Sequence, residues 1–200
     1  MSKLKYPAAI FLDRDGTISP DEYGYLNDPD KYTLYPYAAD CIKLLKELGY
    51  YVILVTNQGG VARGYITMEQ MLSVMQKAQD LLAEEDAYLD KVYYSPYYYD
   101  GVVEPYNIVH EDRKPGIGMF KQALNDFHFR PEHSFMIGDR YSDIGFGKNA
   151  GMKTILVRSG NGEKAFTEEM QNWEIKPDFV VKDLLAATKL IESLLEKEED

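Results

Sequence analysis

The sequence predicts an α/β protein built on a Rossmann-like, doubly wound parallel sheet. The alternation of two kinds of segment supports this fold class. Short apolar runs alternate along the chain with longer segments whose apolar residues recur at helical spacing. Strands that alternate with helices in this way form a parallel sheet covered by helices on both faces. A length of 200 residues fits a single domain, residues 1–200, with a core from about residue 6 to 195.

The first half of the chain predicts two buried strands and two helices. Residues 8–12 and 51–55 are continuous apolar runs of strand length. Between them a helix is indicated by apolar residues at helical spacing, namely Cys41, Leu44, Leu45 and Leu48, and Gly49 is placed to end it. Thr67 and Gln70 have the spacing of a capping box at the start of the second helix. Its apolar stripe, which we assign to the core, consists of Met68, Met71, Leu72, Met75 and Leu82.

The rest of the chain predicts four further strands, over residues 91–94, 134–137, 153–157 and 178–181. A helix after Pro115 and Gly116 is marked by apolar residues at helical spacing, Ile117, Phe120, Leu124 and Phe127. A short helix is expected over residues 142–150. A last helix carries the stripe Leu184, Thr188, Ile191 and Leu195, and the acidic tail 196–200 is most simply a frayed, solvated end.

Composition excludes several classes of protein. The net charge of −11 argues against broad nucleic-acid binding, which needs a basic face. No apolar run approaches the length of about 18–20 residues that a membrane helix needs, and the first residues are too short and weakly apolar for a signal peptide. The single cysteine, Cys41, cannot form an internal disulfide. We therefore expect a cytoplasmic protein without membrane or nucleic-acid partners.

Polar residues follow the predicted strands. In doubly wound sheets, ligands bind outside the carboxyl ends of the strands. Three polar sets follow strands: residues 13–17 (DRDGT), 56–60 (TNQGG) and 138–140 (GDR) with Asp143. A fourth set, residues 113–116 (RKPG), lies ahead of the predicted third helix and is expected at the same edge. Each set alone is a common turn or surface pair, but four of them at one edge predict a functional site.

The combined residue types suit phosphoryl transfer. Three carboxylates, Asp13, Asp15 and Asp139, suit Mg²⁺, which prefers a few protein oxygens and keeps several waters. Thr56 and Asn57 offer hydrogen-bond donors to a phosphate, and the residue at 114 is a lysine whose positive charge can neutralise it. A carboxylate can also act as a covalent nucleophile toward phosphorus.

These motifs resemble those of the haloacid dehalogenase (HAD) superfamily, whose first motif is Asp-x-Asp-Gly-Thr. Within it the chain is most similar to the small capless branch, so no large cap domain is expected. That branch holds heptose bisphosphate phosphatases, histidinol-phosphate phosphatases and polynucleotide 3′-phosphatases. The heptose enzymes are resembled most closely, by residues 13–17, 23–25, 56–65 and 113–115.

The resemblance implies roles for the first-motif residues. Asp13 would attack phosphorus and form an aspartyl-phosphate, and Asp15 would protonate the leaving oxygen and then activate water. Mg²⁺ would be held by Asp13, the main-chain carbonyl of Asp15, and Asp139. Asp143 would orient metal-bound water from outside the ligand set, and Thr56 with Lys114 would stabilise the transferring phosphoryl group.

The resemblance also implies contacts to the rest of the substrate. Arg113 and the loop around Arg63 would bind it, and the segment Tyr23, Gly24 and Tyr25 would close one side of the pocket. Arg14 is expected to point away from Asp13 and Asp15 if strand geometry persists, and is given a structural role.

One departure from the heptose enzymes lies in the loop 95–112. The family carries a zinc loop with three cysteines and a histidine in this region, whereas here the segment has no cysteine. We therefore expect no zinc. The loop is instead expected to be held by its prolines and by the packing of neighbouring tyrosines, Tyr93, Tyr94, Tyr97, Tyr98, Tyr99 and Tyr106.

The expected function is that of a Mg²⁺-dependent phosphomonoesterase acting on a small phosphorylated metabolite, with a heptose bisphosphate favoured. Alternatives are a histidinol-phosphate phosphatase, a nucleic-acid 3′-phosphatase, or a non-catalytic protein that binds a phospho-ligand. Asp13, Asp15 and Lys114 are all present, which counts against the last of these. The protein is expected to be a monomer or a small homo-oligomer.

Overall fold

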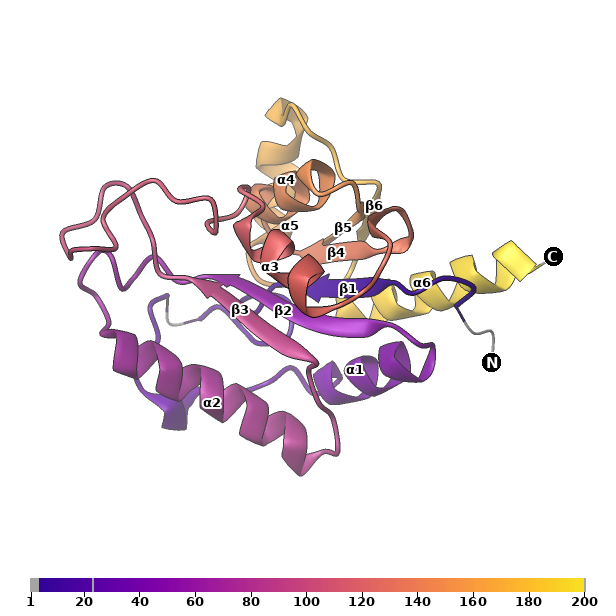
Figure 1. The fold of residues 1–200 in the computed structure, drawn as a ribbon, viewed down its shortest axis with the longest axis horizontal. Helices are drawn as coiled ribbons and strands as arrows, with labels where there is room; N and C mark the ends of the chain where they lie inside the picture. Colours follow the sequence, from indigo (N-terminus) through magenta and orange to yellow (C-terminus); the bar gives the residue numbers. More distant parts are fainter. Residues whose placement is uncertain (1–3, 23, 200) are drawn as a thin grey trace.

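A six-stranded parallel sheet forms the centre of the molecule. The computed structural model describes residues 4–22 and 24–199, with side chains as far as residue 197. The strands lie in the order β3-β2-β1-β4-β5-β6 (Figure 1). Their bounds are β1 Ala9–Leu12, β2 Tyr51–Asn57, β3 Lys91–Ser95, β4 Phe135–Gly138, β5 Lys153–Val157 and β6 Phe179–Val181. All five pairings are parallel, which confirms the predicted fold class.

Helices cover both faces of the sheet. On one face lie α1 (Ala38–Glu47), α2 (Met68–Glu84) and α6 (Leu184–Glu199), and on the other α3 (Gly118–Asp126), α4 (Tyr141–Asn149) and the short α5 (Gly162–Lys164) (Figure 1). Side chains alternate along β1, so Ile10 and Leu12 pack toward the first set while Phe11 packs toward α3 and α4. Both faces of β1 are therefore fully buried.

The remaining turns are short. Three-residue 3₁₀ helices span Pro29–Lys31, Pro131–His133 and Met170–Asn172, and Ala165–Glu169 forms a π-helical turn. The sequence did not predict these helical turns, since segments this short carry too few apolar residues to show a period.

The residues predicted to begin α2 and to end α1 are confirmed. Thr67 and Gln70 form the capping box through reciprocal hydrogen bonds of 2.9 and 3.1 Å. Gly49 follows α1 with φ of 101°, a conformation that favours glycine.

Three expectations differ from the structure. Leu72 and Leu124 were assigned to apolar stripes, but they are 43% and 42% exposed because each lies at the border of its helix's buried face. The acidic tail was expected to fray, whereas α6 continues to Glu199, so the tail is helical as far as the structure describes it.

The carboxyl edge of the sheet is not covered by a second domain. Within residues 4–22 and 24–199, the segments beyond this edge are loops and short turns, which agrees with the expected lack of a large cap. Among the same residues, no helix combines the length and apolar character that crossing a membrane requires.

Candidate active site

The polar sets predicted from sequence meet at the carboxyl ends of β2, β1 and β4. Asp13 directly follows β1, Thr56 and Asn57 end β2, and Asp139 directly follows β4. Because β1 lies between β2 and β4, these strand ends are neighbours. Asp13, Thr56 and Asn57 line a pocket of about 410 Å³, whose wall also includes Asp15, Arg113 and Lys114. Asp139 is buried close to Asp13, outside this wall. The predicted convergence at one edge is therefore observed.

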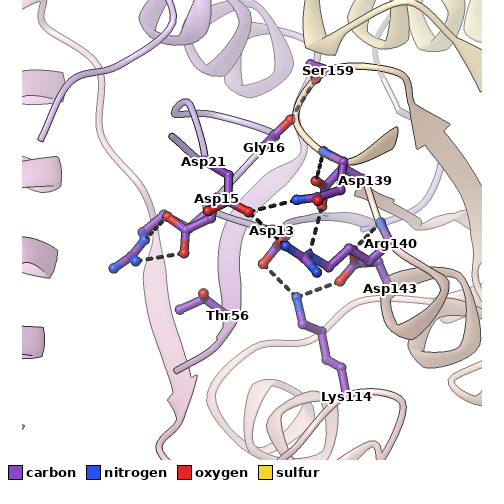
Figure 2. A network of polar contacts seen from close by, with 12 residues as sticks. Asp13, Asp15, Gly16, Asp21, Thr56, Lys114, Asp139, Arg140, Asp143 and Ser159 are labelled. Carbon is purple, nitrogen blue, oxygen red and sulfur yellow. Dashed lines mark hydrogen bonds and ion pairs between the residues drawn. The ribbon is translucent and has the colours of Figure 1, made fainter. Parts of the chain in front are cut away.

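Lys114 lies at the floor of this pocket and joins its parts. Its ammonium group donates a hydrogen bond of 2.7 Å to Asp13 Oδ1 and forms an ion pair of 2.7 Å with Asp143 Oδ1 (Figure 2). It also donates to the main-chain oxygen of Val55 at 2.7 Å. Burial alone would lower the pKa of this lysine, but attraction to Asp13 and Asp143 outweighs burial and raises it. Lys114 is therefore a fixed positive charge beside Asp13.

Asn57 holds the backbone of Lys114 in place. Its side-chain amide donates to the Lys114 carbonyl at 3.0 Å, and its side-chain oxygen accepts from the Lys114 amide at 3.0 Å. From the sequence, Asn57 was expected to donate a hydrogen bond to the phosphate. Here both ends of its side chain are used to position Lys114, although the residue still lines the pocket.

The acidic residues Asp13, Asp139 and Asp143 form a buried cluster. Each offers one oxygen, and these oxygens lie within 4.8 Å of one another. Burial, followed by the charge of Asp143, raises the pKa of Asp13 to about 7 despite the opposing effect of Lys114. Burial and the charges of Asp13 and Asp143 raise the pKa of Asp139 to about 8. A further cation at this cluster would stabilise the ionised forms.

Asp139 carries the clearest sign of a cation site. Its Oδ2 accepts a hydrogen bond of 2.7 Å from the amide of Asn161, whereas its Oδ1 is buried and has no hydrogen-bond partner among the described residues. Gly16 lets the chain approach closely, because a Cβ at this position would lie 2.2 Å from Asp139 Oδ2. Arg140 Nε lies 3.9 Å from Asp139 Oδ1, too far for a hydrogen bond. The cluster therefore has the oxygen chemistry, and a buried oxygen without a hydrogen bond, that suit Mg²⁺.

The carboxylate of Asp15 lies outside this cluster. Arg14 binds it through two hydrogen bonds of 2.9 and 2.7 Å, and the side-chain amide of Gln58 donates to Asp15 Oδ2 at 3.0 Å. The expectation that Arg14 points away from Asp15 is wrong. The chain leaves strand geometry after Leu12 and turns, so neighbouring side chains no longer alternate. The third carboxylate of the cluster is that of Asp143 and not that of Asp15. The expected contact between Asp15 and a metal therefore concerns its main-chain carbonyl alone.

Gln58 is a site residue that sequence reasoning did not select. The same side-chain nitrogen that binds Asp15 also donates to Thr56 Oγ1 at 2.9 Å. Because the Thr56 oxygen accepts this bond, its own proton remains available to an acceptor in the pocket. The motif TNQGG contained Gln58, but nothing in the sequence indicates the turn that aims its amide back toward Asp15.

Arg140 and Asp21 were also missed. Both line the pocket, and Arg140 donates to Asp21 Oδ2 at 2.7 Å (Figure 2). Asp21 also accepts from the side chain of Asn161 at 2.7 Å, and Ser159 donates to the carbonyl of Gly16 at 2.7 Å. These contacts join the turn after β1 to the loops after β4 and β5, across more than a hundred residues of sequence.

The segment expected to close one side of the pocket is partly described. Gly24 and Tyr25 line the pocket, and Tyr23 lies outside the described residues. The Tyr25 hydroxyl accepts a hydrogen bond of 2.7 Å from Arg63, and its ring lies against Gly60, where a Cβ would approach it to 2.4 Å. Arg63, expected to touch substrate, is not part of the pocket wall and stands behind Tyr25.

The loop 95–112 is packed through its aromatic residues. The rings of Tyr97 and His110 stack with centroids 3.8 Å apart, and the rings of Tyr97 and Tyr106 lie 6.0 Å apart. The main-chain amides of Val102 and Val103 donate to the carbonyl of Ala62 at 2.7 and 2.9 Å. The predicted packing is confirmed for Tyr97 and Tyr106, whereas Tyr99 is largely exposed. The expected lack of zinc stays a prediction.

Comparisons with known proteins agree with this geometry. A family model described as HAD-hydrolase-like matches residues 112–187. A D-glycero-D-manno-heptose-1,7-bisphosphate 7-phosphatase of Chlorobaculum tepidum is 37% identical over 183 residues, covering 89% of this chain and 90% of the relative. The D-glycero-β-D-manno-heptose-1,7-bisphosphate 7-phosphatase of Haemophilus ducreyi is 40% identical over 180 residues, covering 88% and 94%.

A solved structure shows the same architecture. The D,D-heptose 1,7-bisphosphate phosphatase of B. bronchiseptica, complexed with magnesium and phosphate, superposes with a TM-score of 0.77 at 27% identity, covering 96% of this chain and 99% of that one. With its parallel sheet, its carboxylate cluster and these relatives, the chain belongs to the HAD-like phosphatases, in one family with the D-glycero-D-manno-heptose-1,7-bisphosphate 7-phosphatases.

Proposed function

We propose that this phosphatase hydrolyses a phosphate ester of a heptose 1,7-bisphosphate with the help of Mg²⁺. One observation carries the proposal: the Lys114 ammonium contacts Asp13 at 2.7 Å at the floor of a pocket that also exposes Asp15. A nucleophile, a fixed positive charge and an acid–base group thus share one cavity. The names of the relatives supply the substrate class.

Asp13 would act as the nucleophile. Its carboxylate attacks phosphorus, the bond to the sugar oxygen breaks, and an aspartyl-phosphate forms. Lys114 favours the ionised form of the attacking group, against the effect of burial, and would face the negative charge that develops on the phosphoryl oxygens. Thr56 is placed to donate its hydroxyl proton to one of those oxygens.

Asp15 would act as the general acid and then as the general base. It gives a proton to the departing sugar oxygen in the first step and takes one from water in the second. That water attacks phosphorus, the aspartyl-phosphate bond breaks, and inorganic phosphate leaves with Asp13 restored. The side chain of Asp15 is 26% exposed, so it can reach groups in the pocket from its position beside Arg14.

Asp13, Asp139 and the main-chain carbonyl of Asp15 would hold Mg²⁺, with Asp143 beside them. When bound, the ion neutralises charge on the carboxylates and on the phosphoryl group. Burial, together with the charges of the neighbouring carboxylates, raises the pKa values of Asp13 and Asp139, and a bound cation would oppose both effects.

A substrate panel tests this function. Purified protein with Mg²⁺ is assayed on heptose 1,7-bisphosphate, other sugar phosphates, histidinol phosphate and a 3′-phosphorylated oligonucleotide, and kcat/KM is compared. We expect the heptose bisphosphate to be preferred and Asp13→Asn to abolish turnover. A preference for histidinol phosphate or for the oligonucleotide would make that compound the substrate in place of the heptose bisphosphate. A lack of turnover on every ester would indicate a protein that binds a phospho-ligand without hydrolysing it.

A further inference from the structure

Two guanidinium groups without a carboxylate partner lie beside the pocket. Within the described part of the chain, neither Arg63 nor Arg113 forms an ion pair with an acidic residue. Unbalanced positive charge is unexpected in a protein whose net charge is −11. Arg113 lines the pocket, whereas Arg63 does not. Such a pair at the mouth of a phosphate pocket creates a local attraction for an anion that the whole protein would repel.

The ring of Tyr98 lies against both guanidinium groups. The guanidinium carbon of Arg63 is 3.7 Å from the ring centroid, and that of Arg113 is 4.8 Å from it. The face of an aromatic ring attracts a cation electrostatically, by about 0.5–2 kcal/mol. Tyr98 itself is not part of the pocket wall. Its ring therefore holds two like charges close together from behind the binding surface.

The position of Tyr98 is fixed by the backbone around it. Its amide donates to the carbonyl of Tyr106 at 3.0 Å, and its carbonyl accepts from Gly101 at 3.0 Å. Arg113 also donates to the carbonyl of Tyr97 at 3.2 Å, so its guanidinium is held by both the ring and the loop backbone.

The absence of a side chain at Gly59 leaves space for Arg113 and Tyr98 to pack against each other. A Cβ at position 59 would lie 3.0 Å from an Arg113 guanidinium nitrogen and 3.3 Å from Tyr98 Cβ. Burial, and to a lesser degree the charge of Arg63, lowers the pKa of Arg113. An incoming anion would relieve this unfavourable environment.

We propose that Tyr98 is a positioning residue: its ring, held between Arg63 and Arg113, orients Arg113 into the pocket to bind a second anionic group of the substrate. The inference rests on the proposed function in so far as that group is the distal phosphate of a sugar bisphosphate. It also gives the loop 95–112 a role in specificity that needs no metal, because the ring is presented by the packed loop itself.

The test compares Tyr98→Phe, which keeps the ring face, with Tyr98→Leu, which removes it, alone and in an Arg113→Met background. The matched control is Tyr88→Leu, since Tyr88 is 57% exposed and outside the pocket wall. Two quantities are measured with p-nitrophenyl phosphate as substrate: its own kcat/KM, and the inhibition constants of fructose 1,6-bisphosphate and fructose 6-phosphate. Turnover of heptose 1,7-bisphosphate by the wild type is measured separately.

In Tyr98→Leu, the inhibition constant of fructose 1,6-bisphosphate is expected to rise about 5- to 20-fold more than that of fructose 6-phosphate. This is the scale of one or two cation–π contacts. Tyr98→Phe and Tyr88→Leu should keep the wild-type ratio, and Tyr98→Leu should add no loss once Arg113 is Met. Two outcomes would overturn the role of Tyr98. One is an equal rise of both inhibition constants in Tyr98→Leu, and the other is an undiminished effect of Tyr98→Leu in the Arg113→Met background. Failure of the wild type to turn over heptose 1,7-bisphosphate would refute the proposed substrate instead, since the inhibition ratio does not depend on that turnover.

Discussion

The guanidinium group of Arg14 binds the carboxylate of Asp15, its neighbour in sequence, through two hydrogen bonds of 2.9 and 2.7 Å. Arg14 is 2% exposed and contacts the sulfur of Met75 at 3.1 Å, whereas the Asp15 side chain is 26% exposed. A buried cation thus fixes a carboxylate that faces the pocket. Arg14 thus balances the charge of the Asp15 carboxylate, which lies outside the cluster of Asp13, Asp139 and Asp143.

The Arg14–Asp15 pair should be measurable in a double-mutant cycle. Asp15→Ala leaves a buried guanidinium without its counter-ion and should cost about 3–5 kcal/mol of unfolding free energy. Arg14→Met should cost less, about 2–3 kcal/mol, because Asp15 is partly solvated. Urea denaturation of both variants and the double mutant gives the coupling. Additive losses would show that the two side chains do not stabilise each other.

The carboxylate cluster should make the metal-free protein less stable as pH rises. The folded-state pKa values of Asp13 and Asp139, about 7 and about 8, lie above the ordinary value of 3.8. Between pH 4 and pH 8 these two groups bind more protons in the folded state than in the unfolded state. The free energy of unfolding therefore falls as the pH rises from about 4 to about 8. Mg²⁺ should restore stability at pH 8, which thermal unfolding with and without the ion measures.

Asp139→Asn separates this effect from general electrostatics. The variant should be more stable than wild type at pH 8 without metal, because the buried carboxylate that is partly ionised at this pH is gone. It should also lose most of the stabilisation by Mg²⁺. The control is Asp40→Asn, whose carboxylate is 79% exposed and pairs with Lys43. A full Mg²⁺ response in Asp139→Asn would remove Asp139 from the proposed ligands.

Lys114→Met should remove the positive charge from the pocket floor. We expect kcat to fall by about 10²- to 10³-fold, the scale of losing one preorganised donor to a developing anion. Lys121→Met is the matched control, since Lys121 is 56% exposed and pairs with Glu111 on the surface. Steady-state rates on p-nitrophenyl phosphate test this. A loss no larger than that of the control would contradict a role for Lys114 at the phosphoryl group.

The sequence was most informative where a functional residue directly follows a strand. Asp13 and Asp139 could be placed because parallel strand ends converge and the strands themselves are continuous apolar runs. Asn161 and Asp21 could not, because their positions depend on turns whose backbone directions no periodicity records. Asn57 shows a subtler limit: its location was predicted, but its hydrogen bonds to Lys114 depend on a contact 57 residues away.

The last prediction concerns the loop 95–112, where we expect aromatic packing to take the place of a zinc site. The loop has no cysteine and offers one imidazole, His110, whose ring is already stacked on Tyr97 at 3.8 Å. Tyr97→Ala should therefore loosen the loop, since a stacked pair contributes about 0.5–1.5 kcal/mol beyond the buried area. Limited proteolysis of the native protein should give faster cleavage within 95–112 in this variant than in Tyr99→Ala, whose side chain is more exposed at 66%.

Elemental analysis completes the argument, because aromatic packing and a bound metal are two different ways of holding this loop. A zinc ion would require the imidazole as a ligand together with three more groups, and thiolates are absent from the loop. Protein purified without added metal and dialysed against a chelator should contain no stoichiometric zinc and should resist proteolysis as well as before dialysis. Zinc that survives dialysis, or a loop that is cleaved rapidly only after it, would mean that a metal and not the Tyr97–His110 stack holds this segment.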